Sequence, residues 1–207
     1  ELFRRWVVSD KKILELEKAT KQTELQQLKK QINPHFLFNM LNNANILVKD
    51  APDEASQILE KLDNLLRYQL NDSTRREVFL TADIQFLTSF LELEKVRRDH
   101  FEYTIFQEGN MENICIPPLL FIPFVENAVK HNLDSDNLSY VHLYFSVHNK
   151  QLTFRCENSK PRVPVKREGG IGLANVKRRL DLLYESRYTL QIEDKETTYN
   201  VNLHLNL

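Results

Sequence analysis

The chain has 207 residues, of which 42% are hydrophobic and 28% are charged, so it can bury a substantial core and is not disordered by composition. A formal net charge of −1 gives it no overall attraction to nucleic acid or to an anionic membrane. The two cysteines, Cys115 and Cys156, lie far apart and have no further cysteines at metal-ligand spacing. Neither a disulfide framework nor a zinc site is indicated, and a reducing, cytosolic setting is expected.

The start of the chain carries no visible targeting signal. No apolar run approaches the roughly 20 residues of a membrane-spanning helix, and no signal peptide is present. The chain starts at Glu1 rather than at a methionine. We therefore expect a piece of a longer protein, in which a membrane segment can precede Glu1.

The first 100 residues predict long helices, because they contain no glycine and are rich in Leu, Glu, Lys and Gln. Residues 1–32 are interpreted as a connector helix that transmits motion. Leu25, Leu28 and Ile32 give this segment a short, weak coiled-coil seam. The helix is expected to continue to about Lys49.

Residues 33–100 are predicted as a helical region. A turn around Pro52 leads into a second helix, which carries an apolar stripe of helical period and ends at residues 71–74. A third helix is expected from residues 81–83 onward. A hairpin of two short helices cannot close its own core. Two copies that form a four-helix bundle would do so, which predicts a homodimer.

Residues 101–207 differ in pattern from the helical first half, and they predict an α+β domain, a two-layer sandwich with helices on one face of a sheet. Alternating apolar residues predict the strands 101–106, 113–116, 140–147, 152–156, 188–193 and 198–205. Helices are expected at 117–132, opened by two prolines, and at 173–184.

The first stretch that can carry chemistry is PFVENAVKHN, residues 123–132. On a helix its apolar residues can face a sheet, which leaves Glu126, Asn127, Lys130 and His131 on the remaining arc. A carboxamide oxygen can ligate magnesium, and the cationic groups can neutralise phosphate charge. The alternative is a solvated helix face with ordinary charge scatter.

The second stretch is EGGIGLANVKRRL, residues 168–180, in which three glycines come just before a helix. Glycine allows close backbone approach, and the start of a helix offers free N–H groups to a phosphate. The spacing matches neither the P-loop nor the dinucleotide fingerprint. A tight loop-to-helix turn is the alternative.

The third stretch is CENS, residues 156–159, at the end of a predicted strand. Glu157 can accept a hydrogen bond from an adenine amino group. A strand-ending turn explains the same residues equally well.

The fourth stretch is QINPHFLFNMLNN, residues 31–43. A histidine on the apolar side of a helix is usually a core residue. Two features favour chemistry at His35 instead. Pro34 removes a backbone N–H and weakens the helix locally. Gln31 and Asn39 lie one turn on either side, where their amides can hold one ring nitrogen and leave the other as a nucleophile.

Together and in this order, the four stretches resemble the LytS-type (LytS/YehU family) sensor histidine kinases, a branch of two-component signalling. QINPHFLFNMLNN is similar to the phosphoacceptor box of that branch. PPLLFIPFVENAVKHN resembles the N box of the ATPase superfamily shared with gyrase, MutL and heat-shock chaperones, and GGIGLANVKRRLDLLY resembles its glycine box. LLRYQL at 65–70 and LELEKVRRDHF at 91–101 also match the branch, so the resemblance covers residues 25–207.

The resemblance implies a Bergerat-type ATP-binding domain over 101–207, with 33–100 as the dimerisation and phosphoacceptor region. It implies that His35 is phosphorylated and that Asn127 binds Mg²⁺. Around the nucleotide it places the following residues: Glu126, Lys130 and His131 at the phosphates, Gly170, Gly172 and Leu173 at the lid hinge, and Asn175 nearby.

The resemblance also implies the reaction and its partners. ATP would phosphorylate His35, and the phosphoryl group would pass to an aspartate of a response regulator, often one with a LytTR domain. The chain would be the cytoplasmic domain of a membrane protein, attached only through an upstream segment.

The chain departs from the family pattern in two places. The adenine motif Asp-x-Gly-x-Gly is replaced by Glu157, Asn158 and Ser159, so glutamate would take the adenine contact without glycine flexibility. Many histidine kinases have an acidic residue directly after the histidine as a general base, but here Phe36 follows. Glu126 is the candidate base.

Two other classes of function compete with a kinase. The departures from the pattern would also fit a non-catalytic dimerisation and partner-binding module with a degenerate ATPase fold. Nucleic-acid binding through Lys177, Arg178 and Arg179 is disfavoured, because Asp181 and Glu185 lie close by and the run is typical of a solvated helix face.

Overall fold

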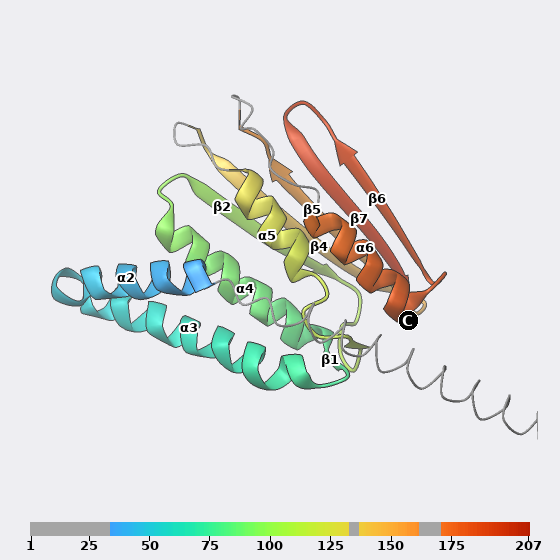
Figure 1. Ribbon diagram of the computed structural model, residues 1–207, viewed down its shortest axis with the longest axis horizontal. Coiled ribbons are helices and arrows are strands. Elements are labelled where there is room, and N and C mark those ends of the chain that lie inside the picture. Colours follow the sequence, from blue (N-terminus) through green and yellow to red (C-terminus); the bar gives the residue numbers. More distant parts are fainter. Residues whose placement is uncertain (1–33, 133–136, 162–170) are drawn as a thin grey trace, which may run out of the picture. The chain divides into compact units, whose positions relative to one another are not determined.

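The computed structural model describes residues 34–132, 137–161 and 171–207. The predicted connector over 1–32 lies outside this range. The described elements are a helical hairpin, a third helix, and a sheet with two further helices, in the order that the sequence predicts (Figure 1).

The hairpin consists of α2 (Pro34–Asp50) and α3 (Pro52–Asn71), which lie side by side and are separated by Ala51 alone (Figure 1). Proline at the first position of α3 costs no helix hydrogen bond, because the first N–H groups of a helix have no partner within it. The predicted apolar stripe is confirmed: Ile58, Leu62 and Leu65 are buried. A short 3₁₀ turn at Asp72–Thr74 ends α3.

The third helix, α4 (Leu80–Arg97), contacts α3 and also β2 (Phe101–Glu108). It is buried on more than one side because it lies between the hairpin and the sheet. Phe36 of α2 packs on Phe90 of α4, with ring centroids 5.0 Å apart. Before α4, the short strand β1 (Val78–Phe79) pairs antiparallel with β3 (Cys115–Ile116), a pairing that local periodicity did not reveal.

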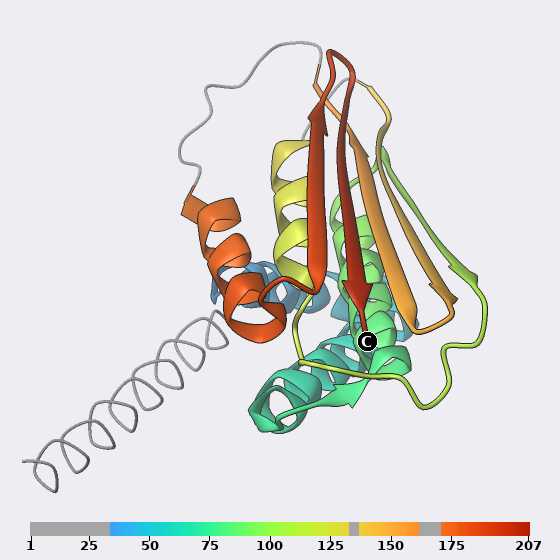
Figure 2. The ribbon, with the colours of Figure 1, turned by 90° about the vertical axis from the view of Figure 1, so that its right-hand side faces the viewer.

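The sheet has five strands in the order β2-β4-β5-β7-β6. Strand β2 runs parallel to β4, and the other neighbours are antiparallel. Helices α4, α5 and α6 lie on one face of the sheet (Figure 2). The remaining bounds are β4 (Ser139–His148), β5 (Gln151–Ser159), β6 (Tyr188–Asp194), β7 (Thr198–Asn206), α5 (Ile122–His131) and α6 (Ile171–Tyr184).

Two sequence predictions need correction next to α5. The helix expected over 117–132 begins only at Ile122, because the preceding loop includes Leu119 in a left-handed conformation, with φ of +56°. The strand expected over 113–116 is limited to Cys115–Ile116, since Asn113 has a φ of +61°. Each residue interrupts regular structure at a position where the local pattern predicted that it would continue.

A buried carboxylate holds this loop. Asp83 of α4 has no exposed surface, and its Oδ1 accepts hydrogen bonds from the Tyr68 hydroxyl (2.5 Å) and from the Leu119 N–H (3.0 Å). Arg179 of α6 donates to the Leu119 carbonyl oxygen (2.5 Å) and to that of Pro118. One polar cluster therefore joins α3, α4, α6 and the loop that leads into α5.

The Tyr68 hydroxyl is the part of this cluster that can be removed without changing shape. We expect Tyr68→Phe to lower the free energy of unfolding by about 1.5–3 kcal/mol, because a buried carboxylate loses a donor. The ring and its stacking on Phe86 (centroids 4.7 Å apart) are retained. Denaturant unfolding measures the change.

Tyr188→Phe is the matched control. Its hydroxyl donates to Asp181 at an exposed site, so we expect a loss of about 0.5 kcal/mol or less. Equal effects of the two substitutions would contradict the role assigned to the buried cluster.

Candidate functional site

Helix α5 presents its polar residues as the sequence predicts. Phe124, Val125, Ala128 and Val129 are buried. Among the others, Glu126, Asn127 and His131 are half-buried and Lys130 is exposed. The apolar half packs on β4 and β5, so the four polar side chains share the remaining arc of the helix.

Glu126 is shielded from water strongly enough to change its acidity. Burial raises the pKa of its carboxyl group from about 4.5 to about 7. A group that is partly ionised at neutral pH can accept a proton and later return it. Among the described residues, no side chain forms a hydrogen bond with this carboxyl group, and it is therefore available to a bound molecule.

Asn127 fits a metal carried by phosphates rather than a metal held by the protein. No hydrogen bond engages its carboxamide within the described part of the chain, and the same part contains no group of three or more His, Cys, Asp or Glu side chains that could hold an ion. Mg²⁺ prefers oxygen ligands, and it commonly takes one or two from the protein and the rest from phosphates and water. One free carboxamide oxygen meets this need.

Near the end of β5, the two residues that are expected to contact adenine lie on opposite faces of the sheet. Phe154, Cys156 and Asn158 alternate along the strand and are buried, and Phe154 packs on Phe124 of α5. Since successive side chains point to opposite faces of a sheet, Asn158 lies on the helix-covered face and Glu157 on the other.

Glu157 is engaged on that other face. It accepts hydrogen bonds from the Tyr140 hydroxyl (3.2 Å) and from Arg155 Nη2 (2.6 Å). Asn158 donates to the Ser159 carbonyl oxygen (2.8 Å). The structure therefore brings Asn158, and not Glu157, to the face that carries α5, and an adenine contact by Glu157 stays a prediction.

The predicted glycine box leads into α6, which contacts α5 on the same face of the sheet. Gly170 lies outside the described residues, and Gly172 is in the first turn of α6. Leu173 is half-buried against the core, and Asn175 is half-buried one turn into the helix.

His35 is the second residue of α2, which contacts α3 and α4. Its neighbour Phe36 is buried and Phe38 is 66% exposed. The apolar residues of this stretch thus divide between a packed and an open side of the helix.

The sequence did not predict the buried charged residues that contact the two ends of α5. Asp83 and Arg179 fix the loop before α5. Glu94 and Arg98 form a second buried group at the end of α4, described below. The available signal was a charged residue among buried apolar neighbours, as at Asp83 between Leu80 and Leu87.

Comparison with known proteins identifies the class. The sequence model of the family described as histidine kinase matches residues 23–101. Sensor protein LytS of Staphylococcus haemolyticus is 30% identical over 203 residues, which cover 91% of this chain and 35% of that protein. Sensor histidine kinase YpdA of Escherichia coli is 31% identical over 119 residues, which cover 58% of this chain and 21% of that protein.

The fold has a counterpart among solved structures. A protein described as a bacterial phosphotransferase superposes with a TM-score of 0.50 at 10% identity, covering 89% of this chain and 96% of that one. This likeness concerns the fold alone, and the relatives in sequence indicate the family. The chain belongs to the LytS-type sensor histidine kinases, and it spans about a third of the length of the LytS relative. No helix of the described residues is both long and apolar enough to cross a membrane.

Glu126 gives the site a testable pH signature. The unfolded chain loses this proton near pH 4.5 and the folded chain near pH 7, so ionised Glu126 destabilises the fold above that range. We expect Glu126→Gln to raise the free energy of unfolding by about 1–3 kcal/mol at pH 8 and to have no such benefit below pH 4.5. Urea unfolding across pH measures this.

Glu112→Gln, at an exposed glutamate, is the control and should change the free energy of unfolding by about 0.5 kcal/mol or less. A Glu126→Gln difference without any dependence on pH would contradict the raised pKa assigned to Glu126.

Proposed function

We propose that this chain is the kinase core of a two-component sensor, which uses ATP and Mg²⁺ to phosphorylate His35 and passes the phosphoryl group to an aspartate of a response regulator. The observation that carries the proposal is the polar arc of α5. Glu126 and Asn127 are half-buried there without side-chain partners among the described residues, beside the helix that follows the glycine box.

The residues of α5 and α6 have distinct tasks in this proposal. Asn127 would supply an oxygen ligand to Mg²⁺, and the ion would withdraw charge from the phosphates. Lys130 and His131 neutralise phosphate charge. The first turn of α6, with Gly172 and Leu173, offers backbone N–H groups to phosphate oxygens, and Gly170 and Asn175 complete that side. Asn158 and Glu157 are the candidates for the adenine end.

The proposed reaction moves one phosphoryl group and one proton. The unprotonated ring nitrogen of His35 forms a bond to the γ-phosphorus, and the bond from that phosphorus to the bridging oxygen breaks, so that its electron pair leaves with ADP. The proton on the other ring nitrogen is released as the phosphohistidine forms. Glu126 accepts this proton, since its raised pKa of about 7 suits that exchange near neutral pH.

The arrangement of domains follows from the same proposal. Residues 33–100 carry the phosphoacceptor, and residues 101–207 hold the nucleotide. Large apolar side chains remain exposed on the hairpin, among them Phe38, Ile46 and Leu70, which supports a second copy of this chain as the partner in a homodimer. The response regulator, a LytTR type in our proposal, would reach the same hairpin. An upstream segment would attach the core to the membrane from the cytosolic side.

A catalytically degenerate signalling module is the second candidate. It is favoured by one observation, the engagement of Glu157 by Tyr140 and Arg155 on the face away from α5. In that case the chain would dimerise and bind a partner without using ATP.

Labelling decides between the two candidates. We expect the full chain, incubated with γ-labelled ATP and Mg²⁺, to acquire acid-labile label that His35→Gln abolishes. His100→Gln is the control, because His100 is exposed and its backbone carbonyl oxygen makes its hydrogen bonds. Label that survives in His35→Gln would contradict the assigned acceptor. No label, together with no ATP binding by calorimetry, would support the degenerate module.

A further inference from the structure

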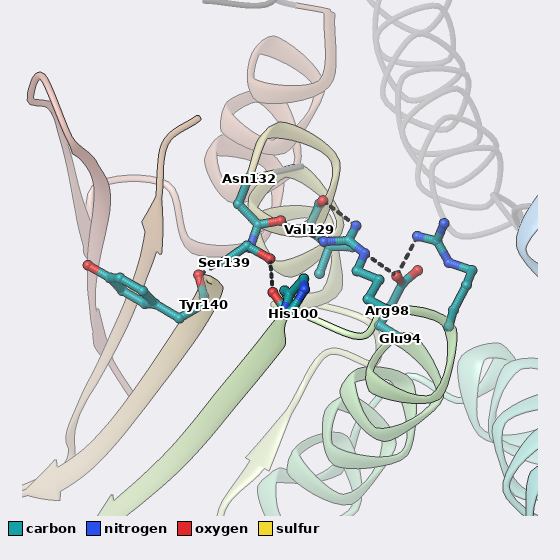
Figure 3. A network of polar contacts seen from close by, with 8 residues as sticks. Glu94, Arg98, His100, Val129, Asn132, Ser139 and Tyr140 are labelled. Carbon is teal, nitrogen blue, oxygen red and sulfur yellow. Dashed lines mark hydrogen bonds and ion pairs between the residues drawn. The ribbon is translucent and has the colours of Figure 1, made fainter. Parts of the chain in front are cut away.

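The stretch LELEKVRRDHF, residues 91–101, contains a buried ion pair between Glu94 and Arg98 (Figure 3). The side chain of Glu94 is 5% exposed and that of Arg98 is 9% exposed, and Arg98 Nε lies 3.2 Å from Glu94 Oε2. Removing two charges from water is costly unless they are paired and hydrogen-bonded. The other contacts of Arg98 therefore show what this burial secures.

Arg98 directs both of its terminal nitrogens at the end of α5 (Figure 3). Nη2 donates to the Val129 carbonyl oxygen at 2.7 Å, and Nη1 donates to Asn132 Oδ1 at 2.9 Å. The last four carbonyl groups of a helix have no partner within it, and a cation there interacts favourably with the helix dipole. Arg98 thus caps α5 from a neighbouring helix.

Asn132 extends this cap to the sheet. It is 1% exposed, and its Nδ2 donates to the Tyr140 carbonyl oxygen of β4 at 3.1 Å. Next to Tyr140, Ser139 donates both its backbone N–H and its hydroxyl to the His100 carbonyl oxygen, each at 2.9 Å. The guanidinium group also lies over the Phe101 ring, 5.1 Å from its centroid. The end of α5 is consequently fixed against α4, β2 and β4 together.

The two residues that Arg98 contacts bracket Lys130 and His131, and Asn127 lies one turn earlier on the same arc. A helix held at its end by a planar, two-pronged donor cannot rotate about its axis without breaking both bonds. We propose that Arg98 is a positioning residue of the nucleotide site, which sets the direction of Asn127, Lys130 and His131 through Val129 and Asn132. This inference rests on the proposed ATP-binding function of α5.

The neighbouring Arg97 provides a matched control. It has the same side chain in the same stretch and donates to the same Glu94 Oε2, at 2.6 Å, but its side chain is 31% exposed. It makes no hydrogen bond to α5 among those found within the described residues. Losing Arg97 therefore removes a charge from the group without releasing the cap on α5.

Calorimetry on the full chain tests the positioning role with Arg98→Lys, Arg98→Met and Arg97→Met. A lysine retains the charge beside Glu94 but cannot donate in two fixed directions. We expect both Arg98 variants to bind Mg²⁺·ATP about 10- to 100-fold more weakly, as for other residues that orient a metal ligand. We expect Arg97→Met to stay within about twofold of the parent chain.

Adenosine, which lacks phosphates, separates positioning from general damage. Its affinity should be equal in all variants, because adenosine has no phosphate groups to meet Asn127, Lys130 and His131. Equal weakening of adenosine and Mg²⁺·ATP, or unchanged Mg²⁺·ATP binding in Arg98→Lys, would overturn the positioning role. Unfolding of Arg98→Lys would also overturn it, since Arg98 would then serve the core alone. Failure of the parent chain to bind Mg²⁺·ATP would instead refute the proposed function, and the positioning role with it.

Discussion

The hydrogen bonds of the Asp83 carboxylate connect helices α3 and α4 with the loop that leads into α5. Asp83 lies on α4, accepts from Tyr68 of α3 and from the backbone of Leu119, and is within electrostatic range of Arg179 on α6. Burial raises the pKa of Asp83 to about 6 even though these partners favour its ionised form. Its position is therefore costly to maintain, and the contacts it makes across four segments are what offset the cost.

Helix α5 is held in this way at both of its ends. Asp83 and Arg179 fix the backbone of Leu119, a few residues before the helix begins, while Arg98 donates to the Val129 carbonyl oxygen near its end. Aromatic packing, as between Phe124 and Phe154, holds its middle on the sheet. A helix fixed in this manner leaves one arc free to meet a ligand, and that arc carries Asn127 and Lys130. A rigidly held helix keeps such polar side chains in a fixed position, which is what the binding of phosphates in one geometry requires.

Local pattern was sufficient for most of the elements, apart from β1 and the start of α5, but not for the long-range contacts between them. The apolar stripe of α3 and the polar arc of α5 follow from helical period alone, and both were predicted from the sequence. The start of α5 was predicted too early, because the loop before it is held by Arg179, sixty residues further along the chain. Asn158 shares the period-two alternation with Phe154, which already places it on the helix-covered face of the sheet, whereas Glu157 falls on the other face. The cap by Arg98 depends on tertiary contacts, which the local pattern of residues 91–101 does not reveal.

In the proposed function, a nucleotide lies against α5 and the start of α6. Hydrogen–deuterium exchange of the full chain, with and without Mg²⁺·ATP, tests it most directly, because bound ligand slows local opening where it binds. Protection is expected at residues 122–132 and over the first turns of α6. Unchanged exchange in both segments under saturating Mg²⁺·ATP, or protection confined to the α2–α3 hairpin, would contradict the claim.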